Sequence, residues 1–220
     1  MEREFWLERW DSDRIGFHQP DTHALLAKHW PALGLPAGSG VFVPLCGKSL
    51  DMRYLEAARH AVIGVEHSRV AIESYFAEGG QSYEREDLPK LARCRGPMTT
   101  LYCGDFFDLR PADLDGVRGV YDRAALIAIP VEKRQQYANH LLRIVPDHTS
   151  MLLITLEYDQ DRVEGPPFSV PPDEVERLFA SQGRIERLEA RPADGLPPRY
   201  HEAGVIATEV AYHIGEDHTR

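Results

Sequence analysis

Charged side chains stand directly after three apolar runs of the chain, where they could contact a ligand. Glu66 follows residues 61–65, Asp105 follows residues 100–103 and a glycine, and Asp122-Arg123 follows residues 117–121. An acidic side chain at such a position can accept hydrogen bonds from both hydroxyls of a ribose. An arginine there can bind a carboxylate or an anionic substrate. From its position alone, Glu66 is equally well explained as a solvated residue at the end of a strand. Arg123 could equally form an ion pair with Asp122 and bind no ligand.

The segment Gly104-Asp105-Phe106-Phe107 combines a carboxylate with flat apolar rings. An adenine ring needs both, namely an acceptor for its amino group and surfaces on which it can stack. At least one of the two phenylalanines is expected to be a core residue instead. The segment therefore predicts an adenine site without deciding which ring contributes to it.

A turn containing Gly47 follows the apolar residues 41–45, and a glycine there lets the backbone approach a ligand closely. We therefore include Gly47 among the candidate cofactor residues. The sequence Gly47-Lys48-Ser49 resembles the end of a P-loop, but that motif requires a glycine where Phe42 stands. Because the backbone cradle for phosphates is absent, hydrolysis of ATP or GTP is disfavoured.

Apolar runs alternate with helical patterns from residue 40 onward. Strands are expected over residues 41–45, 61–65, 100–103, 117–121, 151–156, 184–190 and 205–212, and helices over residues 49–59, 70–77, 131–145 and 172–181. This alternation predicts a mostly parallel sheet with helices on both faces. The last two strands are expected to be joined by a loop, which places one antiparallel strand in the sheet. The predicted fold is α/β and Rossmann-like with seven strands, and residues 79–98 are expected to have little regular structure.

The chain is long enough for one α/β domain, residues 1–220, and no linker divides it. Residues 1–33 are predicted to form a helix, a loop and a second helix. Trp6 and Trp10 lie one helical turn apart, and Phe17 follows them. These rings either pack a helix onto the sheet or form a lid over a bound ligand.

Composition excludes several classes of protein. The formal net charge of −10 disfavours a nucleic-acid partner, because phosphate backbones are bound mainly by Lys and Arg. No apolar run approaches the roughly 20 residues that span a bilayer, and the opening residues lack a signal peptide. Cys46, Cys94 and Cys103 are odd in number and form no CxxC motif, and the histidines form no HExxH motif. We therefore expect a cytoplasmic protein without a metal site or a membrane partner.

Several segments, taken in order, resemble the bacterial branch of the thiopurine S-methyltransferase family. They are FWLERWDSDRIGFHQP, VPLCGKSLDMRYLEAARHAVIGVEHSRVAIE, CGDFFDL, YDRAALIAI, LEYDQDRVEGPPFSVP and the last strand. The resemblance covers nearly all of the chain. It implies a class I methyltransferase fold, S-adenosylmethionine as methyl donor, and aromatic or heterocyclic thiols as acceptors. It also extends the expected acceptors to selenium and tellurium compounds, and we expect a monomer.

The resemblance also implies roles for individual residues. The cofactor would be held by Trp10, Leu45, Glu66 and Arg123, with Asp105 and Phe106 beside the adenine, and the substrate by Phe17, His18, Pro166, Pro167 and Arg199. Residues 79–98 and the tail 215–220 do not follow the family clearly. Those two regions could alter the choice of acceptor.

Methyl transfer from a sulfonium is an in-line displacement that depends mainly on alignment of donor and acceptor. A heterocyclic thiol is largely thiolate near neutral pH, so a strong base is unnecessary. In this hypothesis Arg123 and Arg199 favour the anionic acceptor, while Phe17 and the Pro166-Pro167 turn shape an apolar slot.

No residue is certain to act in catalysis, although His18 or Asp122 could take a proton from a less acidic acceptor. Three alternatives remain open. A nicotinamide dehydrogenase would share the fold, but its GxGxxG fingerprint is absent. The protein could also methylate another small nucleophile, or bind an adenosyl ligand without catalysis.

Overall fold

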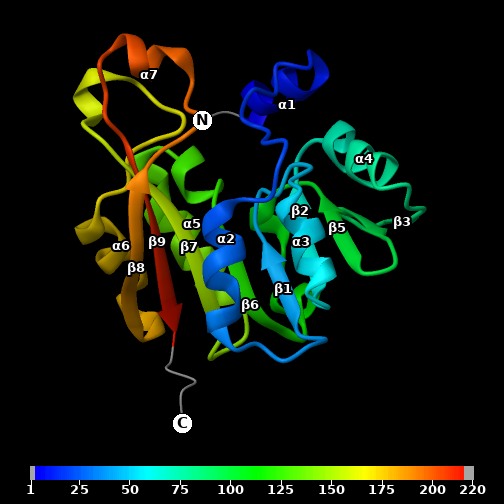
Figure 1. Cartoon of the computed structure of the whole chain (residues 1–220). Coiled ribbons are helices and arrows are strands. Elements are labelled where there is room, and N and C mark those ends of the chain that lie inside the picture. Colours follow the sequence, from blue (N-terminus) through cyan, green and yellow to red (C-terminus); the bar gives the residue numbers. More distant parts are fainter. Residues whose placement is uncertain (1–2, 216–220) are drawn as a thin grey trace.

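A nine-stranded sheet runs through residues 3–215, which are the residues that the computed structural model describes (Figure 1). The strand order is β3-β4-β5-β2-β1-β6-β7-β9-β8. The strands are β1 (Gly40–Val43), β2 (Ala61–Glu66), β3 (Glu84–Asp87), β4 (Ala92–Arg95), β5 (Thr99–Cys103), β6 (Val117–Asp122), β7 (Ser150–Glu157), β8 (Arg184–Pro192) and β9 (Thr208–Gly215).

The middle of the sheet is parallel. Strands β5, β2, β1, β6 and β7 pair in parallel, and β9 inserts antiparallel between β7 and β8. The apolar runs predicted seven of these strands, namely β5, β2, β1, β6, β7, β9 and β8 in their order across the sheet. The α/β class I fold is therefore confirmed. Strand β7 is buried over nearly its whole length, which explains its continuous apolar sequence.

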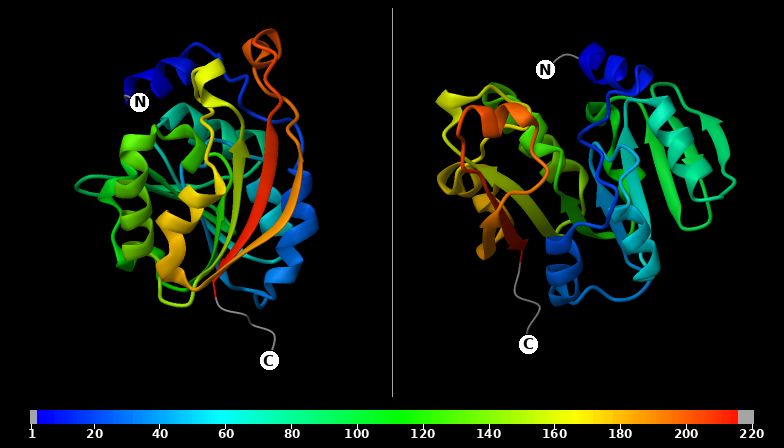
Figure 2. Two further views of the ribbon diagram at one scale, coloured as in Figure 1. Left: turned by 90° about the vertical axis from the view of Figure 1, so that its left-hand side faces the viewer. Right: turned by 45° about the horizontal axis from the view of Figure 1, so that its top comes forward.

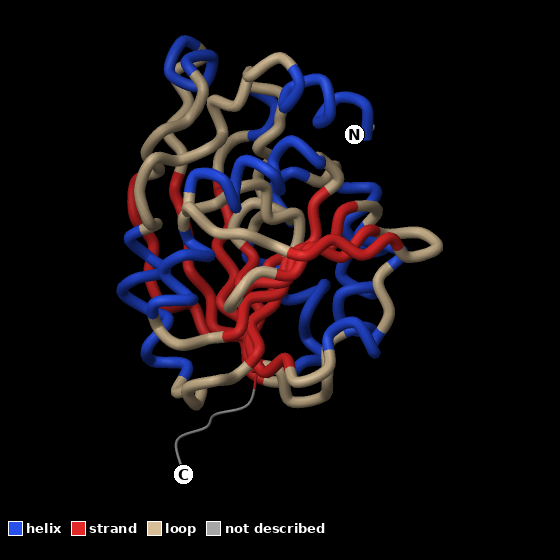
Figure 3. Tube along the Cα trace, turned by 90° about the vertical axis from the view of Figure 1, so that its right-hand side faces the viewer, coloured by secondary structure: helices blue, strands red, loops and turns tan. Residues whose placement is uncertain are grey.

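Helices cover both faces of the sheet, as predicted (Figures 2 and 3). They are α1 (Arg3–Asp11), α2 (Ala24–His29), α3 (Asp51–Ala57), α4 (Arg69–Glu78), α5 (Val131–Ile144), α6 (Pro172–Phe179) and α7 (Pro198–Glu202). Buried side chains of α2, α3 and α4 pack on one face and those of α5 and α6 on the other. None of the described helices is both long and apolar enough to cross a membrane.

The expectation for residues 79–98 was wrong. This segment contributes β3 and β4, an antiparallel hairpin that extends the sheet beyond β5. Its outer strand reads Glu-Arg-Glu-Asp and is exposed throughout, so it carries no apolar periodicity. The connection between β8 and β9 also differs from the expected loop, because it contains the short helix α7.

The N-terminal segment divides into two parts with different surroundings. Leu25, Leu26 and Trp30 are at most 3% exposed and pack against the sheet, so the second half of residues 1–33 belongs to the helix layer. Helix α1 and residues 12–23 instead lie over one end of the strands (Figures 1 and 2). Residues 1–2 and the tail 216–220 lie outside the described part of the chain.

Candidate active site

A cavity of about 470 Å³ opens at the carboxyl ends of the parallel strands. Its volume is within the range of about 300–1,000 Å³ found for small-molecule sites. In open α/β sheets ligands bind at this edge, because the loops after the strands converge there. Most of the predicted site residues line the cavity, namely Trp10, Leu45, Gly47, Glu66, Arg123, Phe17, His18, Pro166, Pro167 and Arg199.

Glu66, the last residue of β2, is 7% exposed and connects two loops of the cavity wall. Its Oε2 accepts a hydrogen bond from the Gly47 N–H at 2.9 Å, and its Oε1 accepts one from the Ser68 N–H at 2.8 Å. Burial raises the pKa of Glu66, and the two N–H donors partly offset that effect. Each carboxylate oxygen keeps further lone pairs, so the group can still accept hydrogen bonds from a ligand.

The turn after β1 depends on the absence of a side chain at Gly47. Leu45 and Gly47 both adopt positive φ, 46° and 53°. A Cβ atom at Gly47 would approach the Trp10 ring to 3.1 Å, in a backbone conformation that costs other residues about 1–2 kcal/mol. The turn therefore lets α1 come close to the loop that lines the cavity.

Three aromatic rings cover the cavity from the N-terminal side. Trp6 and Trp10 each meet Phe17 edge to face, with centroids 5.3 and 5.4 Å apart. Trp10 is 6% exposed, whereas Phe17 is 40% exposed although it lines the cavity. His18 follows, and burial together with the charge of Lys48 lowers the pKa of its imidazole, which favours the neutral ring.

The opposite wall is formed by a proline turn that hydrogen bonds hold in place. Arg199 on α7 donates to the carbonyl oxygens of Glu164 and Pro166. The hydroxyl groups of Tyr158 and Tyr200 both donate to the carbonyl oxygen of Pro167. The structure thus brings Arg199 to the Pro166-Pro167 turn, which lies more than thirty positions earlier in the chain.

The thiopurine S-methyltransferase family model matches residues 1–216. The chain belongs to the thiopurine S-methyltransferase family. Curated relatives agree along almost their whole length. The thiopurine S-methyltransferase of Pseudomonas fluorescens is 44% identical over 95% of this chain and 96% of its own, and that of Bordetella petrii is 45% identical over 93% and 94%.

Solved structures show the same fold at low sequence identity. Magnesium protoporphyrin IX methyltransferase from Synechocystis, bound to S-adenosylhomocysteine, is 12% identical, with a TM-score of 0.63 over 98% of this chain and all of its own. A methyltransferase from Anabaena variabilis described as S-adenosylmethionine-dependent is 15% identical, with a TM-score of 0.62 over 97% and 94%. The protein is therefore an S-adenosylmethionine-dependent methyltransferase of the thiopurine S-methyltransferase family.

The residues present fit this cofactor. Glu66 offers a carboxylate for ribose hydroxyl groups, and the Gly47 turn leaves backbone close to the cavity. The buried Nδ1 of His67 has no hydrogen-bond partner within residues 3–215, and His67 lines the same cavity. Burying a ring nitrogen without a hydrogen-bond partner costs free energy, so a ligand that bonds to this nitrogen would gain binding affinity.

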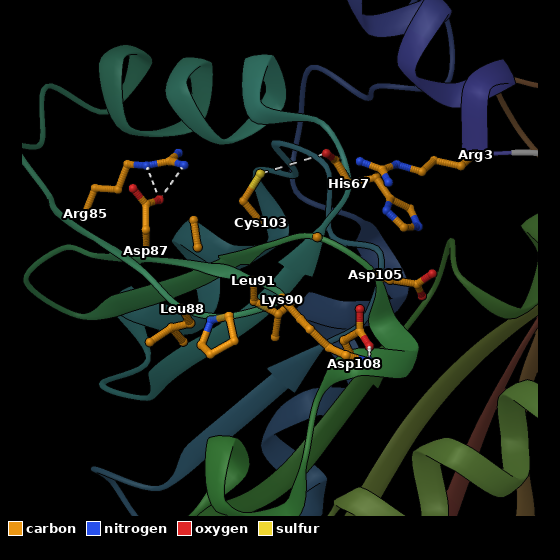
Figure 4. A pocket seen from close by; sticks show the side chains of 13 residues that line it. Arg3, His67, Arg85, Asp87, Leu88, Lys90, Leu91, Cys103, Asp105 and Asp108 are labelled. Atoms are coloured by element: carbon orange, nitrogen blue, oxygen red, sulfur yellow. Dashed lines mark hydrogen bonds and ion pairs between the residues drawn. The ribbon is translucent and has the colours of Figure 1, made fainter.

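Asp105 and Phe106 do not line the large cavity. Asp105 instead lines a second, polar cavity of about 410 Å³ beside β4 and β5 (Figure 4). His67 lines this cavity and the large one. One oxygen of Asp105 accepts a hydrogen bond from the Phe107 N–H at 2.9 Å. Phe106 is 2% exposed and packs against Phe42 and Tyr137, so its ring is a core residue. The adenine role stays a prediction for Asp105, whereas the Phe106 side chain is engaged in the core.

Asp122 points away from the cavity, toward the face that α5 covers. It is fully buried, and its carboxylate accepts hydrogen bonds from the Tyr137 hydroxyl at 2.6 Å and the Leu126 N–H at 3.1 Å. Burial raises the pKa of Asp122 to about 6. A residue without access to the cavity is poorly placed to accept the proton of an acceptor. The structure therefore separates Asp122 from the other candidate base, His18.

Replacement of Asp122 by Asn is expected to change how stability depends on pH. The folded pKa is about 6 against 3.8 for the free side chain, so between these values the folded protein binds more protons than the unfolded chain. Stability must then fall as pH rises through this range, by about 3 kcal/mol at 1.36 kcal/mol per pH unit. Urea unfolding of both proteins between pH 4 and 7 measures this difference. If the free energy of unfolding depended on pH in the same way in the wild type and in Asp122→Asn, this prediction would be wrong.

Several cavity residues were not predicted from the sequence. They are Lys48, Asp51, Tyr121, Thr155, Glu209 and the loop residues 194–198. Asp51 and Tyr121 form one network with Arg123, across roughly seventy positions of the chain. Glu209 lies near the start of β9, which runs antiparallel and so begins at the edge where the parallel strands end. This orientation is the signal that could have placed Glu209 at the site.

Proposed function

We propose that the protein transfers the methyl group of S-adenosylmethionine to the sulfur of thiopurines and related aromatic or heterocyclic thiols. The observation that carries this proposal is the shared cavity. The predicted cofactor residues Trp10, Glu66 and Arg123 and the predicted acceptor residues Phe17 and Arg199 line the same space. The names of the curated relatives support the same acceptor class.

The cofactor, when bound, supplies an electrophilic methyl group on a sulfonium. Its transfer to an acceptor thiolate would form the new bond to sulfur as the sulfur–methyl bond of the donor breaks, and would give the S-methyl product and S-adenosylhomocysteine. Arg123, whose side chain is 19% exposed, offers a positive charge to an acceptor thiolate. Arg199 adds a second cation, and within residues 3–215 it donates hydrogen bonds to the carbonyl oxygens of Glu164 and Pro166, with no carboxylate of that part of the chain to neutralise it.

The protein residues mainly bind, orient and exclude water. The rings of Trp10 and Phe17 and the Pro166-Pro167 turn provide apolar surface on two sides of the cavity. Holding the acceptor in line can contribute about 7–11 kcal/mol in well-oriented reactions. His18, with its lowered pKa, is placed to take a proton from an acceptor that is not already a thiolate.

We further propose that the chain acts as one domain, as a monomer and in the cytoplasm. Cys46, Cys94 and Cys103 are all free thiols, which is typical of a reducing compartment. The edge strand β3 carries four charged residues, and charged edges disfavour pairing with a second sheet. The acidic net charge supports the absence of a nucleic-acid partner.

Incubation with methyl-labelled S-adenosylmethionine tests the activity directly. We expect label to enter a thiopurine, and not the corresponding oxopurine, because only the thiol ionises near neutral pH and offers a soft nucleophile. Binding of the cofactor without transfer of label to any thiol would indicate a non-catalytic adenosyl-binding protein. Transfer to other nucleophiles but not to the thiopurine would identify a different acceptor class.

A further inference from the structure

Asp51, the first residue of α3, lines the cavity and joins three elements there. It is 1% exposed. Its Oδ2 accepts hydrogen bonds from the Tyr121 hydroxyl at 2.9 Å and from Nη1 of Arg123 at 3.0 Å. Its Oδ1 accepts the backbone N–H of His23 at 2.7 Å. A single buried carboxylate therefore ties α3 to the end of β6 and to the N-terminal segment.

The first consequence concerns the orientation of Arg123. A guanidinium has five N–H donors in a rigid plane, so a short bond from Nη1 to a buried carboxylate limits how the plane can turn. Charge-assisted bonds of this kind are about twice as strong as neutral ones. The part of the guanidinium that is not directed at Asp51 can then face the cavity, which Arg123 lines.

The second consequence concerns the segment that carries Phe17 and His18. We call residues 12–23, between α1 and α2, the strap. The strap ends at His23, whose N–H bonds to Asp51 and whose Nε2 lies 3.1 Å from Oε1 of Glu209. Asp51 therefore holds the end of the strap through the backbone of His23, and Glu209 holds it through the His23 side chain.

We propose that Asp51 is a positioning residue for methyl transfer, which orients Arg123 and anchors the strap so that both walls of the acceptor site keep their relative places. This proposal rests on the proposed function above, because it assigns Asp51 to the alignment of the acceptor. Asp51 acts through Arg123 and the strap, and it need not touch the reacting atoms.

Removal of the Asp51 carboxylate changes both the charge beside the cavity and the positioning of Arg123, and these two changes affect the kinetics differently. An Asp51→Asn variant has one more unit of positive charge beside the cavity, which by itself strengthens the attraction of a thiolate. The amide also keeps only one acceptor oxygen, so it cannot satisfy Arg123 and His23 equally. If Asp51 positions Arg123, kcat falls while KM for the acceptor does not rise. If Asp51 only stabilises the fold, the melting temperature falls and kcat stays.

The test compares Asp51→Asn with Glu174→Gln. Glu174 forms a buried ion pair with Arg134 on the opposite face of the sheet, so it matches the loss of a buried carboxylate away from the cavity. For Asp51→Asn we expect a tenfold to hundredfold lower kcat, a scale that misplacement of about 1 Å can reach. For Glu174→Gln we expect a lower melting temperature with kcat within about twofold of the wild type.

A second measurement does not depend on activity. Trypsin cleavage after Arg14, whose side chain is 58% exposed, reports how firmly the strap is held. In Asp51→Ala, which loses both acceptor oxygens, we expect cleavage at least fivefold faster than in the wild type, without any ligand. Glu174→Gln should be cleaved at the wild-type rate. If Asp51→Ala does not fold, the same comparison is made with Asp51→Asn.

The outcomes distinguish failure of this proposal from failure of the proposed function. An active wild type whose folded Asp51→Asn variant keeps kcat within twofold, with unchanged cleavage of the strap, overturns the positioning role alone. A wild type that transfers no methyl group to a thiopurine overturns the proposed function. In that case faster cleavage in Asp51→Ala still supports the anchoring of the strap, and unchanged cleavage overturns it.

Discussion

Removal of residues 1–18 is expected to leave a folded protein that has lost methyl transfer by a factor on the order of 100 or more. The deleted segment contains α1, Trp10 and Phe17, which cover the cavity, whereas both hydrophobic core clusters are built from residues of α2 and later elements. A site open to water loses both alignment and the strengthened electrostatics of an enclosed cavity. Initial rates with a thiopurine, together with circular dichroism and thermal unfolding, measure the two effects separately.

A full-length control separates a covering role from a purely structural one. S-adenosylhomocysteine should slow trypsin cleavage after Arg9 and Arg14 in the wild type, because a bound ligand stabilises the covered form. Equal cleavage rates with and without this ligand, combined with near-normal activity after the deletion, would show that the segment is not a lid.

Loss of the Glu66 carboxylate is expected to weaken binding of the cofactor by roughly tenfold to 150-fold. Hydrogen bonds to a charged group contribute about 1.5–3 kcal/mol, and 1.4 kcal/mol corresponds to a tenfold change in affinity. In Glu66→Ala the N–H groups of Gly47 and Ser68 also lose their acceptor, so stability falls as well. Glu66→Gln keeps the size of the side chain and one acceptor oxygen, so it removes the charge and leaves only one of these two N–H groups without its acceptor.

Calorimetric titration with S-adenosylhomocysteine measures this effect in both variants. Glu73→Gln on the neighbouring helix α4 is the matched control, because Glu73 forms an exposed pair with Arg69. Exposed pairs of this kind contribute little to stability, so we expect unchanged affinity for that control. An affinity of Glu66→Gln equal to that of the wild type would show that Glu66 does not hold the ribose.

The sequence by itself determined the parallel centre of the fold and the edge at which the site lies. Buried strands such as β7 need continuous apolar residues, and this signal is local. Parallel strands carry their carboxyl ends to one edge, so Glu66 and Arg123 could be placed at a common site before any contact was known. The hairpin of β3 and β4 escaped prediction because its outer strand is exposed and charged along its whole length.

Tertiary structure alone decided which charged groups meet and which are excluded from the site. Asp122 and Arg123 are adjacent, but Asp122 is the last residue of β6 and Arg123 lies in the loop that follows it. Asp122 bonds to Tyr137 beneath α5, while Arg123 lines the cavity and pairs with Asp51. The pairing of Asp51 with Arg123 spans 72 positions of the chain. Such a contact depends on how α3 packs beside β6, and no local pattern of residue types encodes that distance.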